Sequence, residues 1–115
     1  MIEQVSLVGD GATHAGIFDV PYLRCIPNMI IMSPSDENEC WKMLSTGYNY
    51  SGPAAIRYPR GEGPGTEILE NFDLLKIGKA RVISEISSDI VIFSFGNMLD
   101  LSLEIADQIK CSLID

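Results

Sequence analysis

The sequence is poor in basic residues and contains a single histidine and no long apolar run. Lys and Arg number 8 against 16 Asp and Glu among 115 residues, which gives a formal net charge of -8. This acidic balance argues against nucleic acid and anionic membranes as partners, although a few local Arg side chains suffice for a phosphate ligand. No apolar run approaches the ~18 residues of a membrane span. The N-terminus also lacks the basic and apolar regions of a signal peptide, so a cytoplasmic protein is predicted.

Cysteine is also scarce. The three cysteines are Cys25, Cys40 and Cys111, an odd number whose spacing matches no zinc or CxxC pattern. We therefore expect reduced, mostly buried thiols and no cysteine-based metal site.

A glycine-rich stretch over residues 9–16 (Gly-Asp-Gly-Ala-Thr-His-Ala-Gly) follows an apolar run over residues 5–8. Glycine lets the backbone come close to a ligand at the end of a strand. His14 in this turn is suited to proton transfer near neutral pH, and Asp10 lies four positions before it. A surface turn with a solvated histidine is the alternative interpretation.

Apolar runs alternate with helical patterns along the chain. Strands are predicted over residues 4–8, 29–33, 54–58, 80–83, 89–95 and 111–114, and helices over 17–25, 36–47 and 99–109. Asp36 is expected to cap the second helix, with Glu39 at the third helical position. Its apolar face is expected to include Cys40, Met43, Leu44 and Tyr48.

This alternation predicts an α/β fold with two partial, open, parallel-sheet units joined by a Gly/Pro linker. The first unit is expected over residues 1–61, the linker over 62–73 and the second unit over 74–115. Each unit has only about 50 residues, below the size at which a domain is comfortably stable alone. We therefore expect the chain to be part of a longer protein.

Several motifs run in one order through the chain. They are Asp10-Gly11-x-Thr13-His14-x-Gly16, Phe18-Asp19, Tyr22-Leu23-Arg24-Cys25-Ile26-Pro27, Ser33-Pro34-Ser35-Asp36-Glu37-Asn38-Glu39-Cys40, Gly52-Pro53-Ala54 and Arg57-Tyr58-Pro59-Arg60-Gly61. Together they resemble the 1-deoxy-D-xylulose-5-phosphate synthase family of the transketolase superfamily. The similarity is dense over residues 5–61 and weaker over 74–115. It implies the end of a pyrimidine-binding domain followed by the start of a transketolase C-terminal domain.

The resemblance implies a thiamine-diphosphate-dependent transferase that uses Mg²⁺ and acts as a homodimer. The family's reaction condenses pyruvate with D-glyceraldehyde 3-phosphate, releases CO₂ and supplies isoprenoid, thiamine and pyridoxal synthesis. The main cofactor and magnesium motifs of the family are absent from this sequence. We therefore expect the chain alone to be inactive.

Four residues match functional positions of the family. His14 matches the acid/base histidine, and Asp10 matches the acidic residue that orients it or binds a substrate hydroxyl. Arg60 matches the arginine that holds the aldehyde's phosphate, and Arg57 is a second candidate for that phosphate. An Asx-turn is the alternative role for Asp10, and an ion pair at the end of a strand is the alternative for Arg57. The turn at Val8-Gly9-Asp10-Gly11 is one residue shorter than in the family. This difference affects the expected position of Asp10, and so its role, more than that of His14.

Two other functions compete with that of an enzyme segment. The chain is either a non-catalytic remnant or interaction module that pairs with other synthase segments through its sheet edges, or a separate anion-binding module. The anion-binding module would use Arg57, Arg60 and the glycine loop over residues 61–65.

Overall fold

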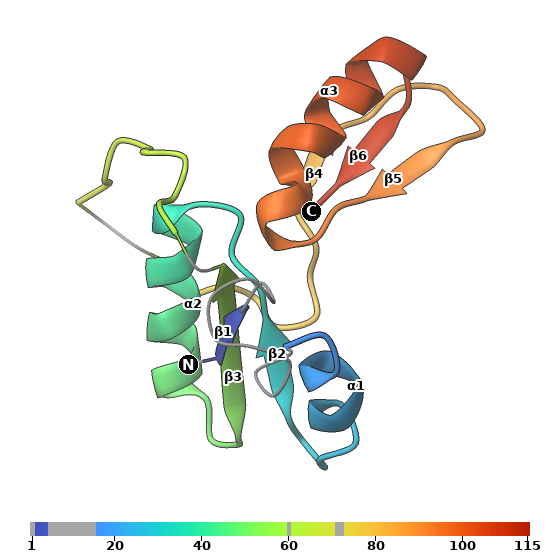
Figure 1. Ribbon diagram of the computed structural model, residues 1–115. Helices are drawn as coiled ribbons and strands as arrows, with labels where there is room; N and C mark the ends of the chain where they lie inside the picture. The colour runs from blue at the N-terminus through green and yellow to red at the C-terminus, as the bar shows by residue number, and fades with distance from the viewer. Residues whose placement is uncertain (1, 5–15, 60, 71–72) are drawn as a thin grey trace.

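The first unit is a three-stranded parallel sheet with two helices (Figure 1). The computed structural model describes residues 2–4, 16–59, 61–70 and 73–115. In chain order the elements are β1 (Ile2–Gln4), α1 (Asp19–Leu23), β2 (Ile30–Met32), α2 (Glu37–Asn49) and β3 (Ala54–Pro59). The strand order is β1-β3-β2, so β3 is central and its residues Ala55 and Ile56 are buried. The predicted strands over 29–33 and 54–58 are therefore confirmed.

Helix α2 begins where its capping signal predicts. The backbone N–H of Glu39 donates to Oδ1 of Asp36 at 2.7 Å, which satisfies one of the free donors at the helix start. The prediction for Tyr48 is wrong, because this residue is 91% exposed. The buried face passes through Glu39 and Thr46 instead. In this last turn the residue that approaches the sheet is Gly47, where a Cβ would lie 3.3 Å from Ile56 and 3.4 Å from Ala54.

The second unit contains a three-stranded sheet covered on one face by a helix (Figure 1). Its elements are β4 (Val82–Ser84), β5 (Val91–Phe93), the 3-10 turn η1 (Gly96–Met98), α3 (Leu99–Ile109) and β6 (Ser112–Ile114). Helix α3 has the predicted bounds. The core consists of Ala106, Cys111 and Leu113, with Ile83 and Ile92 packed against it.

The α/β fold class is confirmed, but the second sheet is not parallel throughout. Strand β6 lies between β4 and β5, parallel to β5 and antiparallel to β4. The pair β5–β6 is joined by α3, the crossover that parallel neighbours require. No such crossover helix involves β4, so its direction was not determined by the strand–helix–strand pattern.

One face of the second sheet carries exposed apolar side chains. Val82 and Phe93 both align with Ile114 across the sheet, so the three share a face. Val82 is 60% exposed and Phe93 is 76% exposed, whereas the alternate residues Ile83 and Ile92 pack in the core. Helix α3 therefore covers only the opposite face.

The predicted linker over residues 62–73 contains no helix or strand in its described part, residues 62–70 and 73. The predicted division into residues 1–61 and 74–115 stays a prediction. Of the described helices, none combines the length and apolar character needed to cross a membrane. All three cysteines are free thiols, and Cys25 is exposed where a buried thiol was expected.

Candidate functional site

The candidate site lies at the carboxyl ends of the parallel strands of the first unit, where α/β sheets commonly bind ligands. Strand β3 ends at Pro59, directly before Arg60, and the glycine-rich stretch follows β1 in the sequence. Of the four predicted site residues, only Arg57 is described. Asp10, His14 and Arg60 lie outside the described residues, so their roles stay predictions.

Arg57 joins β3 to the start of α1. Its Nε donates to Oδ2 of Asp19 in a close ion pair, and its Nη2 donates to the carbonyl oxygen of Gly16 at 3.0 Å. The Asp19 side chain is 3% exposed and the Arg57 side chain is 13% exposed. A charge removed from water to this extent needs a partner of opposite charge. Asp19 and Arg57 provide this partner for each other.

This arrangement matches the alternative given for Arg57, an ion pair at the end of a strand. Two of its donors are committed to Asp19 and Gly16, the latter two positions after His14 in the sequence. Arg57 thereby fixes the end of the glycine-rich stretch against β3. A contact between Arg57 and a substrate phosphate stays a prediction.

A pocket of about 360 Å³ lies at the same edge of the sheet, beside the loop that follows β3. Its described lining includes Tyr58, Pro59 and Gly61, the residues on either side of Arg60 in the sequence. The charged side chains of this described lining are the carboxylates Asp36, Glu37, Glu62 and Asp100. An anionic substrate at this edge would therefore depend on Arg60 for compensation of its charge.

The glycine loop already holds a carboxylate of the chain itself. The backbone N–H groups of Gly65 and Thr66 donate to Glu37 at 2.8 and 3.2 Å, and the Thr66 hydroxyl donates to it at 2.8 Å. A Cβ on Gly63 would overlap this carboxylate, so glycine permits the close approach. These donors are occupied, which argues against this part of the loop as a free anion site.

These hydrogen bonds lower the pKa of Glu37 from 4.5 to about 2, with the Thr66 hydroxyl the largest cause, followed by the backbone N–H groups of Glu37 and Gly65. A lowered pKa stabilises the fold above the unfolded value of 4.5, and this contribution is lost as the pH falls through about 2. The attachment of the loop to α2 is therefore expected to weaken between pH 4.5 and 2.

Thr66→Val is expected to raise the pKa of Glu37 from about 2 toward 4.5, because valine keeps the shape of threonine and removes the hydroxyl donor. Carbon-13 NMR of the Glu37 carboxyl group during an acid titration measures the midpoint. Thr66→Ser, which retains the hydroxyl, is the matched control and should leave the midpoint near 2. An unchanged midpoint in Thr66→Val would contradict the assignment.

Two further side chains of α2 hold the segment that follows. Asn38 donates to the carbonyl oxygen of Glu67 at 2.9 Å and accepts from the N–H of Leu69 at 3.0 Å. The Thr46 hydroxyl accepts from the N–H of Leu75 at 2.9 Å. Contacts along the helix thus attach the predicted linker, and Leu75 shortly after it, to the first unit.

Sequence reasoning missed Asp19 and Glu37 as organising residues. Asp19 was recognised only as part of a motif, and its partner Arg57 lies 38 positions away. Glu37 was likewise recognised only as part of a motif, and its partners lie 28 and 29 positions away. No local sequence pattern predicts a contact between residues separated by so many positions along the chain. Within the described ranges, no three His, Cys, Asp or Glu side chains form a group that could hold a metal ion.

Residues 2–66 match the family model "Transketolase, pyrimidine binding domain". Over 115 residues the chain is 53% identical to the 1-deoxy-D-xylulose-5-phosphate synthase of Marinomonas sp. (strain MWYL1), covering 99% of this chain and 18% of that relative. It is 51% identical over 120 residues to the synthase of Vibrio atlanticus (strain LGP32), covering 99% of this chain and 19% of that protein. The chain therefore spans about a fifth of the length of these relatives.

Proposed function

The chain belongs to the transketolase pyrimidine-binding domain family, and on this basis we propose that it acts as part of a 1-deoxy-D-xylulose-5-phosphate synthase. The observation that carries the proposal is the similarity to these synthases over 99% of the chain. The similarity extends beyond the family match at residue 66, through the second unit.

The proposed reaction joins pyruvate to D-glyceraldehyde 3-phosphate with loss of CO₂, in the cytoplasm and in a homodimer. His14 donates and accepts the proton at the substrate carbonyl oxygen, and Asp10 orients its imidazole. Arg60 binds the phosphate of the aldehyde through its guanidinium donors. Arg57 and Asp19 act as positioning residues, because their ion pair and the Gly16 contact hold the end of the His14 segment against β3.

When bound, thiamine diphosphate with its Mg²⁺ would supply the carbanion chemistry of this reaction. The described residues provide no group of three ligands for a metal ion. Because the sequence lacks the cofactor and magnesium motifs of the family, we assign binding of the diphosphate and Mg²⁺ to other parts of the synthase, and assign proton transfer and substrate binding to this chain.

A chimeric enzyme tests the proposal. In the Marinomonas synthase, this chain replaces the 115 matched residues, and this protein is called the chimera below. We expect turnover within about tenfold of the parent, because the groups that act on the substrate are kept in place together. Formation of 1-deoxy-D-xylulose 5-phosphate is followed by mass spectrometry. A folded, dimeric chimera without activity would contradict the proposal.

The exposed apolar face of the second sheet favours a second candidate, a non-catalytic interaction module. Val82 and Phe93 on this face are the kind of surface that other protein segments cover. A module of this kind predicts a chimera that folds and assembles but forms no product. The same assay therefore distinguishes the two functions.

A further inference from the structure

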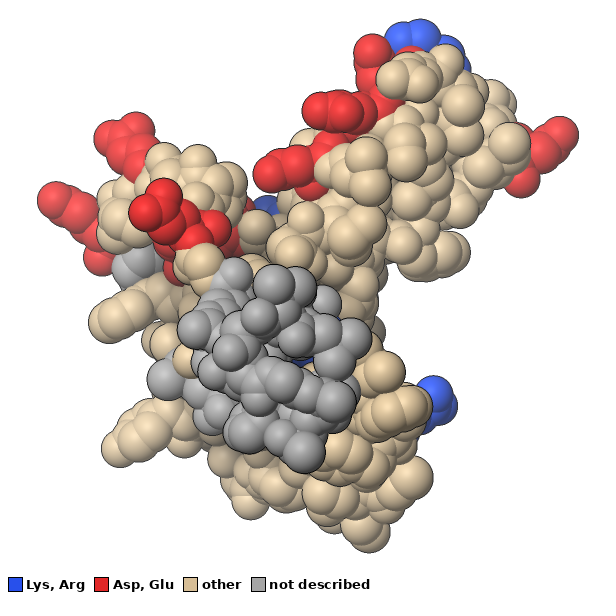
Figure 2. Space-filling view, in the orientation of Figure 1, with Lys and Arg blue, Asp and Glu red and all other residues tan. Residues whose placement is uncertain are grey.

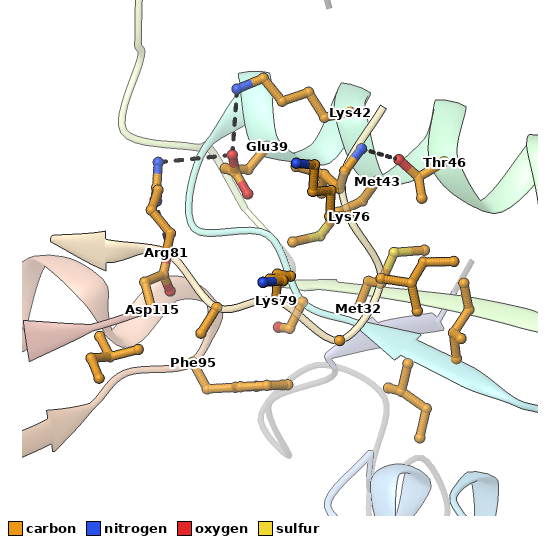
Figure 3. A pocket seen from close by; sticks show the side chains of 18 of the residues that line it. Met32, Glu39, Lys42, Met43, Thr46, Lys76, Lys79, Arg81, Phe95 and Asp115 are labelled. Atoms are coloured by element: carbon orange, nitrogen blue, oxygen red, sulfur yellow. Dashed lines mark hydrogen bonds and ion pairs between the residues drawn. The ribbon is translucent and has the colours of Figure 1, made fainter. Parts of the chain in front are cut away.

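A cleft of about 920 Å³ lies between the two units (Figure 3). Its walls come from β2 and α2 of the first unit and from β5, β6 and the 75–81 segment of the second. Clefts between units are frequent binding sites for small molecules. The synthase function proposed above uses none of the side chains that line this cleft, one of which is Phe93 of the exposed apolar face.

The cleft gathers basic residues from an acidic chain. Of the 8 Lys and Arg in the sequence, four line it: Lys42, Lys76, Lys79 and Arg81. Its acidic side chains are Glu39 and Asp115, so the side chains that line it carry an excess of positive charge. Elsewhere carboxylates dominate, and Figure 2 shows them along α3 and over the loop beside the start of α2.

The two carboxylates of the cleft pair with two of its cations. Asp115 accepts from Nη2 of Arg81 at 2.6 Å, and Oε1 of Glu39 lies 3.6 Å from Nζ of Lys42 and 3.8 Å from Nη1 of Arg81. The other two cations, Lys76 and Lys79, have no ion pair to any residue that the structure describes. Their ammonium groups are therefore available to a ligand.

A tight turn fixes the backbone positions of these two lysines. The N–H of Lys79 donates to the carbonyl oxygen of Lys76 at 3.1 Å, and Gly78 between them has φ of 76°. Such a φ in the third position of a turn favours glycine, because a Cβ there is strained. The Lys-Ile-Gly-Lys turn consequently presents both lysines at the edge of one cleft (Figure 3).

Apart from Ser33, Thr46 and Ser94, the rest of the cleft is lined by apolar residues and glycine. Met32 and Met43 line it from the first unit, and Leu75, Ile77 and Phe95 line it from the second. Phe95 is exposed, so its ring has surface left for a partner. A ligand that fits this lining combines an apolar body with an anionic group.

We propose that this cleft binds a phosphate monoester with a small apolar body, with the phosphate between Lys76 and Lys79 and the body against Phe95 and the two methionines. A dianion suits two unpaired ammonium groups, and lysines act as point charges that accept a phosphate in several orientations. The described lining of this cleft shares no residue with that of the pocket beside Pro59.

Phenyl phosphate is the probe, titrated into the 115-residue chain and followed by NMR at the backbone amides of residues 76–79. We expect a Kd of about 1 mM or tighter, a reasonable value for a ligand of this size. Phenol has the body without the charge and inorganic phosphate has the charge without the body, and both should bind at least about tenfold more weakly. Binding should weaken with added salt.

The double variant Lys76→Gln/Lys79→Gln is expected to raise the Kd at least about tenfold, and Lys76→Arg/Lys79→Arg to retain binding. Lys110→Gln, an exposed lysine outside the cleft, is the matched control and should stay within about twofold. Circular dichroism verifies that each variant keeps the fold.

The variant Arg60→Gln separates this proposal from the proposed function. Binding that survives Arg60→Gln and is lost in the lysine double variant supports the cleft. Binding lost in Arg60→Gln alone would place the phosphate at Arg60 and overturn the proposal. No binding, or equal binding of phenol, would overturn it as well.

Discussion

Replacing His14 with alanine in the chimera is expected to lower kcat by about 10²- to 10⁴-fold, the usual contribution of a positioned acid/base group. The reason is that His14 is the only histidine of the chain and is proposed to transfer the proton at the substrate carbonyl oxygen. KM for both substrates should change by less than about threefold, since the lost interaction belongs to the transition state. Steady-state kinetics with each substrate varied separately measures both quantities.

Two variants serve as controls for His14→Ala. Asp10→Asn should reduce kcat by less than His14→Ala, because Asp10 is proposed to act through the imidazole. Tyr48→Ala removes a ring that is 91% exposed and should leave kcat unchanged. If kcat of His14→Ala equals that of the chimera, His14 has no part in the reaction.

Replacing Asp19 with alanine is expected to lower the free energy of unfolding by about 3–5 kcal/mol, because it leaves the guanidinium of Arg57 buried without its partner. A loss of this size is comparable to the whole stability of a small domain, about 5–15 kcal/mol. Urea unfolding of the 115-residue chain, followed by circular dichroism, measures the change.

The double variant Asp19→Ala/Arg57→Met tests whether the loss comes from the ion pair. It should cost less than the two single variants added together, because the second change removes the unpaired charge. Asp89→Ala, an exposed acid before β5, is the matched control and is expected to cost at most about 0.5 kcal/mol. If Asp19→Ala unfolds at the same urea concentration as Asp89→Ala, the buried pair does not stabilise the unit.

The local signals in the sequence were sufficient for most helices and strands. The bounds of α3 and the cap of α2 by Asp36 follow from residues within one helical turn of each other. Such signals act through hydrogen bonds and side-chain spacing that need no distant partner. The direction of β4 could not be predicted from these local signals, because it depends on pairing with β6, which lies about 30 positions further along the chain.

In the candidate site, too, some features were predicted from the sequence and others became visible only in the tertiary structure. The identity of His14, Asp10 and Arg60 as candidates came from motifs in the sequence. The pairing of Arg57 with Asp19 and the capture of the glycine loop by Glu37 came only from the tertiary structure. Arg57 illustrates the difference, because its sequence context allowed either a phosphate contact or an ion pair.

The sequence by itself determined that this chain has an α/β fold, belongs with transketolase-type proteins and carries one histidine in a glycine-rich turn. These features can be recognised from short segments of sequence and from the order in which the motifs occur, without knowledge of any distant contact. The tertiary structure alone decided which charges meet: Arg57 with Asp19, Glu37 with the loop, and four of the eight cations around one cleft. Charge pairing acts through space, so it depends on how the strands and helices pack and leaves no periodic pattern along the chain.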